Sequence, residues 1–179
     1  MILHLIRHPK PLIEPGICYG QLDIPAENPE FIARELRQKI PSHVPVWSSP
    51  LQRCRALAEA LHPTPHFDAR LMEMNFGEWE GRPWDDVPRA ALDAWADDVA
   101  NYIPPGGESA FQVRERLADF FAKNSFEEVA VVTHSGVIKT LLSSHNKQSL
   151  SSTLKLVVPY GSMTTLYCFC HILFSANEM

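Results

Sequence analysis

The sequence has few of the features that mark secreted, membrane-bound or nucleic-acid-binding proteins. Its 179 residues contain only four cysteines, none of them in a Cys-x-x-Cys pair, which argues against a disulfide framework. No apolar run is long enough to span a bilayer, and the N-terminus lacks the basic region and long apolar stretch of a secretory signal. The net charge of -5 and the absence of any Lys/Arg run argue against a nucleic-acid surface. We therefore expect a cytoplasmic protein with reduced thiols and with neither a membrane nor a nucleic-acid partner.

Metal ligands are also scarce in the sequence. His62 and His66 have helical spacing, but Pro63 and Pro65 forbid a helix through this segment. No other cluster of histidine, cysteine and acidic residues has the spacing of a metal site. We therefore expect neither a metal ion nor another cofactor.

The composition and the apolar pattern predict a globular α/β protein. Apolar residues make up 45% of the chain and charged residues 21%, and the length suits a single domain spanning residues 1–179. No internal repeat, low-complexity tract or linker divides the chain. Short apolar runs alternate with segments of helical periodicity, which is typical of an α/β sandwich.

The strands and helices can be placed by their apolar patterns and capping residues. We expect strands at residues 2–6, 44–47, 129–133, 154–158 and 163–170. Ser49 and Gln52 have the spacing of a capping box, so a helix should begin at Pro50. Further helices are expected from Asn28-Pro29, over residues 84–100, after Ser109 and after Gly136.

Chemically active side chains follow several of these expected strands. Arg7-His8 follows the first strand, and His134 follows the strand at residues 129–133. Arg53 lies in the first turn of a helix that follows another strand, and a carboxylate-rich loop at residues 71–81 lies between them in the chain. Because ligands bind at the carboxyl edge of an open α/β sheet, we expect these groups to converge there. Each residue taken alone is more often an ordinary surface or structural residue, so the prediction depends on the whole set.

This set of side chains suits phosphoryl transfer. Guanidinium groups and helix N-termini form an anion pocket where negative charge develops. A neutral imidazole attacks phosphorus through one ring nitrogen if the other nitrogen donates its proton to a fixed acceptor. A carboxylic acid then protonates the leaving oxygen and later takes a proton from water. The set therefore predicts metal-free hydrolysis of a phosphomonoester.

Five segments in chain order form a recognisable series of motifs. They are Leu5-Ile6-Arg7-His8, Ser48-Ser49-Pro50-Leu51-x-Arg53-Cys54-x-x-Leu57-Ala58, Glu73-x-x-Phe76-Gly77-x-Trp79-Glu80-Gly81, Gly106-Gly107-Glu108-Ser109 and Val132-Thr133-His134. The series resembles the histidine phosphatase superfamily, and most of all its phosphoglycerate-mutase-like branch. That resemblance implies a three-layer α/β/α sandwich with a mostly parallel central sheet. The loop at residues 16–25 is similar to that of α-ribazole-5'-phosphate phosphatases, which implies this substrate or another small phosphomonoester.

The resemblance also implies roles for individual residues. His8 would be the phosphorylated nucleophile, and Glu73 would be the proton donor, with Glu78 as the rival acid. The phosphate pocket would be lined by Arg7, Arg53 and His134. Contacts to the phosphate or to the leaving group would come from Tyr19, Gly20, Gln21 and Ser135.

The chain departs from the family pattern at two positions. Pro9 stands where the family usually has a glycine after the catalytic histidine, and proline fixes φ and has no N–H. If the turn needs an N–H or a positive φ at residue 9, the pocket would be weakened. Ser135 stands where a glycine is more usual, and it adds a hydroxyl beside the expected phosphate site.

Two other functions use the same residues. A mutase would return the phosphoryl group from the histidine to a second hydroxyl, although the chain lacks the long insertion associated with mutases. A phosphate-binding module without turnover would result if Pro9 and Ser135 had disabled the reaction. Substrate choice is expected to depend on residues 79–105, where three tryptophans are expected to pack in the core rather than to stack on a ligand.

Overall fold

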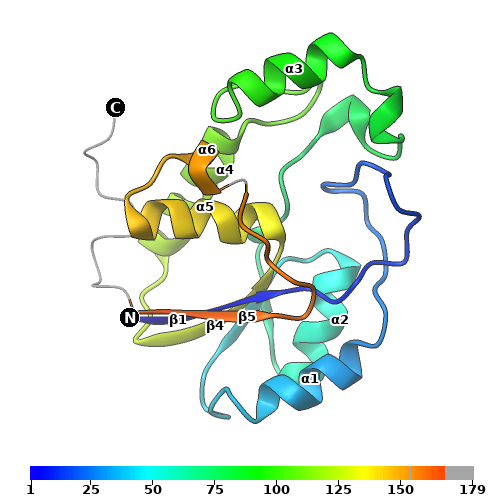
Figure 1. The fold of residues 1–179 in the computed structure, drawn as a ribbon. Helices are drawn as coiled ribbons and strands as arrows, with labels where there is room; N and C mark the ends of the chain where they lie inside the picture. Colours follow the sequence, from blue (N-terminus) through cyan, green and yellow to red (C-terminus); the bar gives the residue numbers. More distant parts are fainter. Residues whose placement is uncertain (154, 168–179) are drawn as a thin grey trace.

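A computed structural model describes residues 1–153 and 155–167 of the chain (Figure 1). Within these ranges, no helix has the length and the apolar character needed to cross a membrane. Three short 3-10 turns lie at Ala69–Leu71, Gly77–Trp79 and Trp84–Asp86. The longer elements, in chain order, are β1 (Ile2–Arg7), α1 (Pro29–Arg37), β2 (Val46–Ser48), α2 (Gln52–Leu61), β3 (His66–Phe67), α3 (Arg89–Asp97), α4 (Ala110–Lys123), β4 (Glu128–Thr133), α5 (Ser135–Asn146), α6 (Leu150–Thr153) and β5 (Met163–Tyr167).

The five strands form one mostly parallel sheet in the order β3-β2-β4-β1-β5, which confirms the predicted fold class. Only the edge strand β5 runs antiparallel to its neighbour, β1. The register of the central pair places Arg7 opposite Thr133. The residues that follow, His8 and His134, therefore leave the sheet side by side at its carboxyl edge, where open α/β sheets bind ligands.

Helices cover both faces of the sheet (Figure 1). Successive side chains of a strand point to opposite faces, so β1 and β4 contribute to two separate cores. Leu5 and Val131 pack with α4 and α5 on one face, whereas Ile6 and Val132 pack with α1 and α2 on the other. Burial on both faces explains why these two strands read as almost continuous apolar runs.

The helix expected over residues 84–100 is shorter than predicted. A 3-10 turn occupies Trp84–Asp86, and α3 begins only at Arg89, with Pro88 as its N-cap residue. A proline cannot continue a preceding helical turn, because it lacks the N–H and its ring restricts the residue before it. The helix expected after Ser109 is confirmed, and Ser109 forms a capping box with Gln112 there.

The capping box expected at Ser49 and Gln52 is wrong. Helix α2 has Leu51 as its N-cap residue and has no side-chain cap. The backbone N–H of Gln52 donates instead to the carboxylate of Asp23, at 2.7 Å, from a loop distant in the chain. The hydroxyl of Ser49 is thereby left to serve another partner, the imidazole of His134.

The closing strands also differ from the prediction. Residues 155–158 are not part of a strand, and residue 154 lies outside the described residues. The carbonyl of Val158 accepts a hydrogen bond from Arg7, and Pro159 has no N–H to offer to a ladder. The last strand is confirmed over Met163–Tyr167, whereas residues 168–170 lie outside the described residues.

Candidate active site

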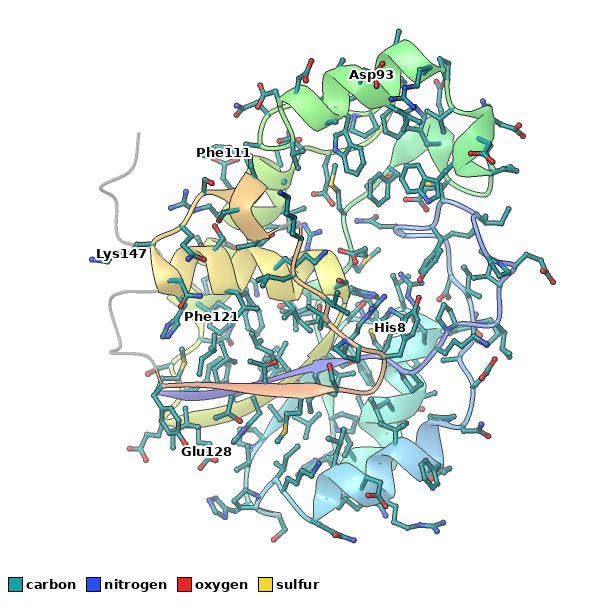
Figure 2. All side chains as sticks on the ribbon, in the orientation of Figure 1. His8, Asp93, Phe111, Phe121, Glu128 and Lys147 are labelled. Atoms are coloured by element: carbon teal, nitrogen blue, oxygen red, sulfur yellow. The ribbon has the colours of Figure 1, made fainter. Side chains whose placement is uncertain are left out.

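The structure brings the predicted residues of three separate segments together at the carboxyl edge of the sheet. The ring centroids of His8 and His134 lie 5.1 Å apart, and Nε of Arg53 lies 3.3 Å from Nδ1 of His134. All three side chains are almost completely buried. Figure 2 shows His8 at the end of the sheet, where side chains from several loops crowd together.

His8 is held as a neutral imidazole with one defined tautomer. Its Nδ1 lies 2.6 Å from the carbonyl oxygen of Pro9, which can only accept, so Nδ1 donates and Nε2 carries the lone pair. Burial, followed by the positive charge of Arg53, lowers the pKa of His8 to about 3, although the hydrogen bond to Pro9 acts in the opposite direction. At neutral pH, His8 therefore presents an unprotonated Nε2.

His134 is fixed from both sides of its ring. Its Nδ1 accepts from Nε of Arg53, so Nε2 carries the hydrogen and donates to the hydroxyl of Ser49 at 2.9 Å. Burial, followed by the positive charge of Arg53, holds the pKa of His134 well below its ordinary value. Ser49 was expected only as a helix cap, and no sequence pattern links it to His134, 85 residues away.

Arg53 is a fully buried cation whose partners are not carboxylates. Its guanidinium donates to the backbone carbonyls of Gly20 and Leu22, and to the neutral ring of His134. In the part of the chain that the structure describes, no acidic side chain forms an ion pair with it. A buried charge without a counter-ion is costly, so the site favours an incoming anion.

Arg7 offers the second guanidinium of the site. It donates to the carbonyl of Val158, but its buried Nε has no hydrogen-bond partner among the described residues. The ring of Tyr160 covers the guanidinium, with 3.8 Å from Cζ to the ring centroid. The unpaired Nε–H is a donor that an anion can satisfy.

Two tyrosines from distant loops meet beside these cations. The hydroxyls of Tyr19 and Tyr160 are 2.8 Å apart, and the ring of Tyr160 is 5.7 Å from that of His8. Burial raises the pKa of Tyr19, so its hydroxyl stays protonated. Tyr160 was missed by sequence reasoning, because a single tyrosine in a turn before the last strand carries no periodic or motif signal.

Glu73 lies at the N-terminus of helix α5. Its two carboxylate oxygens accept from the backbone N–H groups of Met74 and Gly136, each at 3.0 Å. The two hydrogen bonds fix the position of the Glu73 carboxyl group beside the first turn of α5. A Cβ at residue 136 would lie 2.4 Å from Oε1 of Glu73, so a side chain at this position would displace the carboxyl group.

The rival acid, Glu78, has an exposed side chain in the 3-10 turn Gly77–Trp79. Glu80, two residues further along the chain, forms hydrogen bonds with the loop that contains Gln21. Its Oε1 accepts from the backbone N–H groups of Gln21 and Phe76 at 2.8 and 2.9 Å, and Oε2 accepts from that of Leu22. Glu80 therefore fixes the loop that carries the predicted contact residues.

The ion pair between Arg116 and Glu108 fixes the backbone of Glu73. Arg116 of α4 donates to the carbonyl of Glu73 at 3.0 Å and to Glu108 at 2.9 Å. The side chain of Gln21 donates to the same carbonyl, at 3.1 Å, and to Glu108 at 3.3 Å. Gln21 therefore braces the loop of Glu73, and Glu108, expected as part of a turn, belongs to the same network.

The remaining predicted residues lie at the border of the site. Gly20 packs so closely that an added Cβ would lie 2.0 Å from the carbonyl oxygen of Met74. Ser135 is the first residue of α5, directly after His134. Across residues 1–153 and 155–167, no group of three or more His, Cys, Asp and Glu side chains is arranged to hold a metal ion.

Two neutral imidazoles and two guanidinium groups lie together at the carboxyl edge of a mostly parallel sheet, an arrangement with the chemistry to hold an anion. The sequence pattern of the histidine phosphatase superfamily (branch 1) matches residues 3–169, so the chain belongs to that superfamily. This membership confirms the resemblance inferred from the motifs.

Similarity to individual proteins supports this membership. The chain is 26% identical over 158 residues to the adenosylcobalamin/alpha-ribazole phosphatase of Salmonella typhimurium, which covers 80% of this chain and 78% of that protein. It is 46% identical over 55 residues to the fructose-2,6-bisphosphatase TIGAR of Xenopus tropicalis, 31% of this chain but only 20% of that protein. A crystal structure of phosphoglycerate mutase from Thermus thermophilus superposes with a TM-score of 0.74 and 31% identity, covering 93% of this chain and 92% of that one.

Proposed function

We propose that the protein hydrolyses a small phosphomonoester through a phosphohistidine at His8. The observation that carries this proposal is the hydrogen bond from Nδ1 of His8 to the carbonyl of Pro9. It leaves Nε2 as a nucleophilic lone pair beside the buried guanidinium of Arg53, which has no carboxylate partner among the described residues. An imidazole that served only as a hydrogen-bond donor would not need this combination.

In the first step, Nε2 of His8 attacks phosphorus and the bond from phosphorus to the leaving oxygen breaks. Arg7 and Arg53 neutralise the charge on the phosphoryl oxygens. Glu73, as the carboxylic acid, gives its proton to the leaving oxygen, which departs as an alcohol. The positive charge that forms on the phosphorylated ring is stabilised by the carbonyl of Pro9, which keeps its bond to Nδ1–H.

In the second step, the alcohol is replaced by water. The Glu73 carboxylate takes a proton from this water, whose oxygen attacks phosphorus as the bond to Nε2 breaks. Inorganic phosphate leaves, and His8 and Glu73 return to their starting protonation states. The steps use no metal ion and no redox cofactor.

For the substrate, the proposal favours α-ribazole-5'-phosphate. The similarity of the loop at residues 16–25 supports this choice, as does the relative from Salmonella typhimurium that is named an adenosylcobalamin/alpha-ribazole phosphatase. A mutase is the second candidate, because the similar Thermus thermophilus structure is described as a phosphoglycerate mutase. Incubation with 3-phosphoglycerate and analysis of the products separates the two, since a mutase yields the isomer rather than free phosphate.

The proposal is tested by hydrolysis of p-nitrophenyl phosphate in the presence of a chelator. The natural protein should stay active, and His8→Ala should fall to the uncatalysed background. His43→Ala is the matched control, because His43 is exposed and far from the site in the fold. Rapid acid-free quenching with labelled substrate should trap a phosphoryl group on His8 that acid then releases. Phosphate binding without any turnover would overturn the proposal in favour of a phosphate-binding module.

A further inference from the structure

A cavity of about 180 Å³ lies beside Glu73. Its walls come from helices α3, α4, α5 and α6, which Figure 1 shows gathered above the sheet. Three of its lining residues, Glu73, Ser135 and Gly136, also border the candidate active site. The cavity and the phosphate site therefore share one wall, and Glu73 is at their junction.

The position of Glu73 determines which part of the substrate the cavity would hold during the reaction. In an in-line displacement, the leaving oxygen lies opposite the attacking Nε2 of His8, and it must be within reach of the acid that protonates it. If that acid is Glu73, the carbon skeleton attached to the leaving oxygen continues past Glu73. The cavity borders Glu73 and provides room for that skeleton.

The walls of the cavity are mostly apolar. Phe76 and Trp95 contribute aromatic rings, and Val99, Val113 and Leu150 contribute aliphatic side chains. An apolar cavity of about 150 Å³ is large enough for a benzene ring. Burying a second carboxylate against such walls, as a phosphoglycerate would require, costs free energy.

Two polar groups in the cavity lining, on Trp95 and Lys139, add a requirement for the chemistry of the ligand. The indole N–H of Trp95 is buried and has no hydrogen-bond partner within the described ranges. Buried tryptophan N–H groups usually find an acceptor, so an acceptor on a bound molecule would satisfy it. Lys139 adds one cationic side chain to the wall formed by α5, and burial, followed by the charge of Arg7, lowers the pKa of this side chain.

We propose that this cavity binds the alcohol half of the substrate and selects phosphomonoesters of ring-bearing, largely apolar alcohols that carry a hydrogen-bond acceptor. The inference rests on the proposed hydrolysis and deepens it, because it assigns substrate choice to α3, α4 and α5 rather than to the phosphate site. Trp95 and Ala110 are then specificity-determining residues.

The test compares benzyl phosphate with glycerol 3-phosphate, since both release an alkyl alcohol and only one carries a ring. The natural protein should prefer benzyl phosphate. Ala110→Leu narrows the cavity, so we expect its kcat/KM for benzyl phosphate to fall about tenfold or more while that for glycerol 3-phosphate is retained. Trp95→Leu removes the aromatic ring from the cavity wall. It should also lower kcat/KM for benzyl phosphate relative to that for glycerol 3-phosphate. It serves as the second variant if Ala110→Leu does not fold.

A binding measurement makes the result independent of turnover. Ligand-observed NMR should detect benzyl alcohol on the natural protein and on His8→Ala, but not on Ala110→Leu. An unchanged substrate ratio in folded variants, an equal loss for both substrates, or retained benzyl alcohol binding by Ala110→Leu would overturn the cavity assignment. A different result would contradict the proposed hydrolysis alone. In that case the natural protein hydrolyses neither benzyl phosphate nor glycerol 3-phosphate, while benzyl alcohol still binds.

Discussion

The carbonyl oxygen of Pro9 accepts a hydrogen bond of 2.6 Å from Nδ1 of His8. Pro9 departs from the family pattern, and the departure would weaken the site if residue 9 needed a positive φ or an N–H. Among the described residues, the only ones other than glycine with positive φ are Asn28 and Lys147, so residue 9 does not need glycine. The group that contacts His8 is a backbone carbonyl, which proline retains.

The neutral state of His8 predicts an acid-sensitive stability. An unfolded histidine takes up a proton below its ordinary pKa of about 6.5, whereas folded His8 does so only near its lowered pKa of about 3. In this window the unfolded state binds more protons, so the stability due to neutral His8 is present above pH 6.5 and is lost as the pH falls toward 3.

Urea unfolding at pH 7 and at pH 5 measures this loss. Between pH 7 and pH 5, protonation of His8 in the unfolded state should lower the free energy of unfolding by about 2 kcal/mol. In His8→Ala, the drop over the same interval should be smaller by that amount, with the remaining drop due to His134 and other groups. Equal drops in the two proteins would show that His8 is not held neutral.

The buried charge of Arg53 predicts that stabilisation by phosphate depends on this residue. Arg53→Met removes a fully buried cation together with its hydrogen bonds to Gly20, Leu22 and His134, so the protein should lose some stability in phosphate-free buffer. Phosphate at one hundred times its Kd should stabilise the natural protein by about 2.7 kcal/mol, and this gain should vanish in the variant.

Arg55→Met is the matched control for that experiment. Arg55 lies two residues further along α2, stacks on the ring of Phe67 and pairs with Glu59 rather than facing the site. Its loss should leave the stabilisation by phosphate intact. If both arginine variants respond to phosphate as the natural protein does, the anion site is not at Arg53.

The assignment of the proton donor predicts a dependence on the leaving group. Glu73→Gln should lower kcat/KM for an alkyl phosphate by about 10² to 10⁴, the usual worth of a general acid. The loss should be smaller with p-nitrophenyl phosphate, because p-nitrophenolate departs without a proton. Glu78→Gln, on an exposed side chain, should leave both values unchanged. The reverse pattern would make Glu78 the acid.

Much of the fold could be predicted because its signals are local. The apolar runs before His8 and His134 predict two buried parallel strands, and the carboxyl edge of such strands lies on one side of the sheet. Errors arose where a distant segment replaced a local partner. Gln52 receives its cap from Asp23 rather than from Ser49, and no pattern within one helix reports such a contact.

The same limit applies to the candidate site. The residues with the strongest chemistry were found because each follows an apolar strand or belongs to a motif. Glu80 and Tyr160 were missed because their partners, the loop of Gln21 and the guanidinium of Arg7, reach them only through the tertiary fold. In the hydrogen bond between Tyr160 and Tyr19 the two residues are 141 positions apart, which is beyond any pattern read along the chain.

Gly136→Ala separates the position of the acid from the stability of the fold. Gly136 lies in the first turn of α5, where alanine has a helix propensity better by about 1 kcal/mol, so the variant should be at least as stable. The new Cβ would lie 2.4 Å from Oε1 of Glu73 and should displace the carboxylate from its bond to the backbone of residue 136. We therefore expect Gly136→Ala to reproduce the leaving-group dependence of Glu73→Gln, losing more activity on an alkyl phosphate than on p-nitrophenyl phosphate. In the double variant, the alanine should cost nothing further, because the acid it displaces is already absent. Additive losses would instead place the role of Gly136 in the helix itself and not in the position of Glu73.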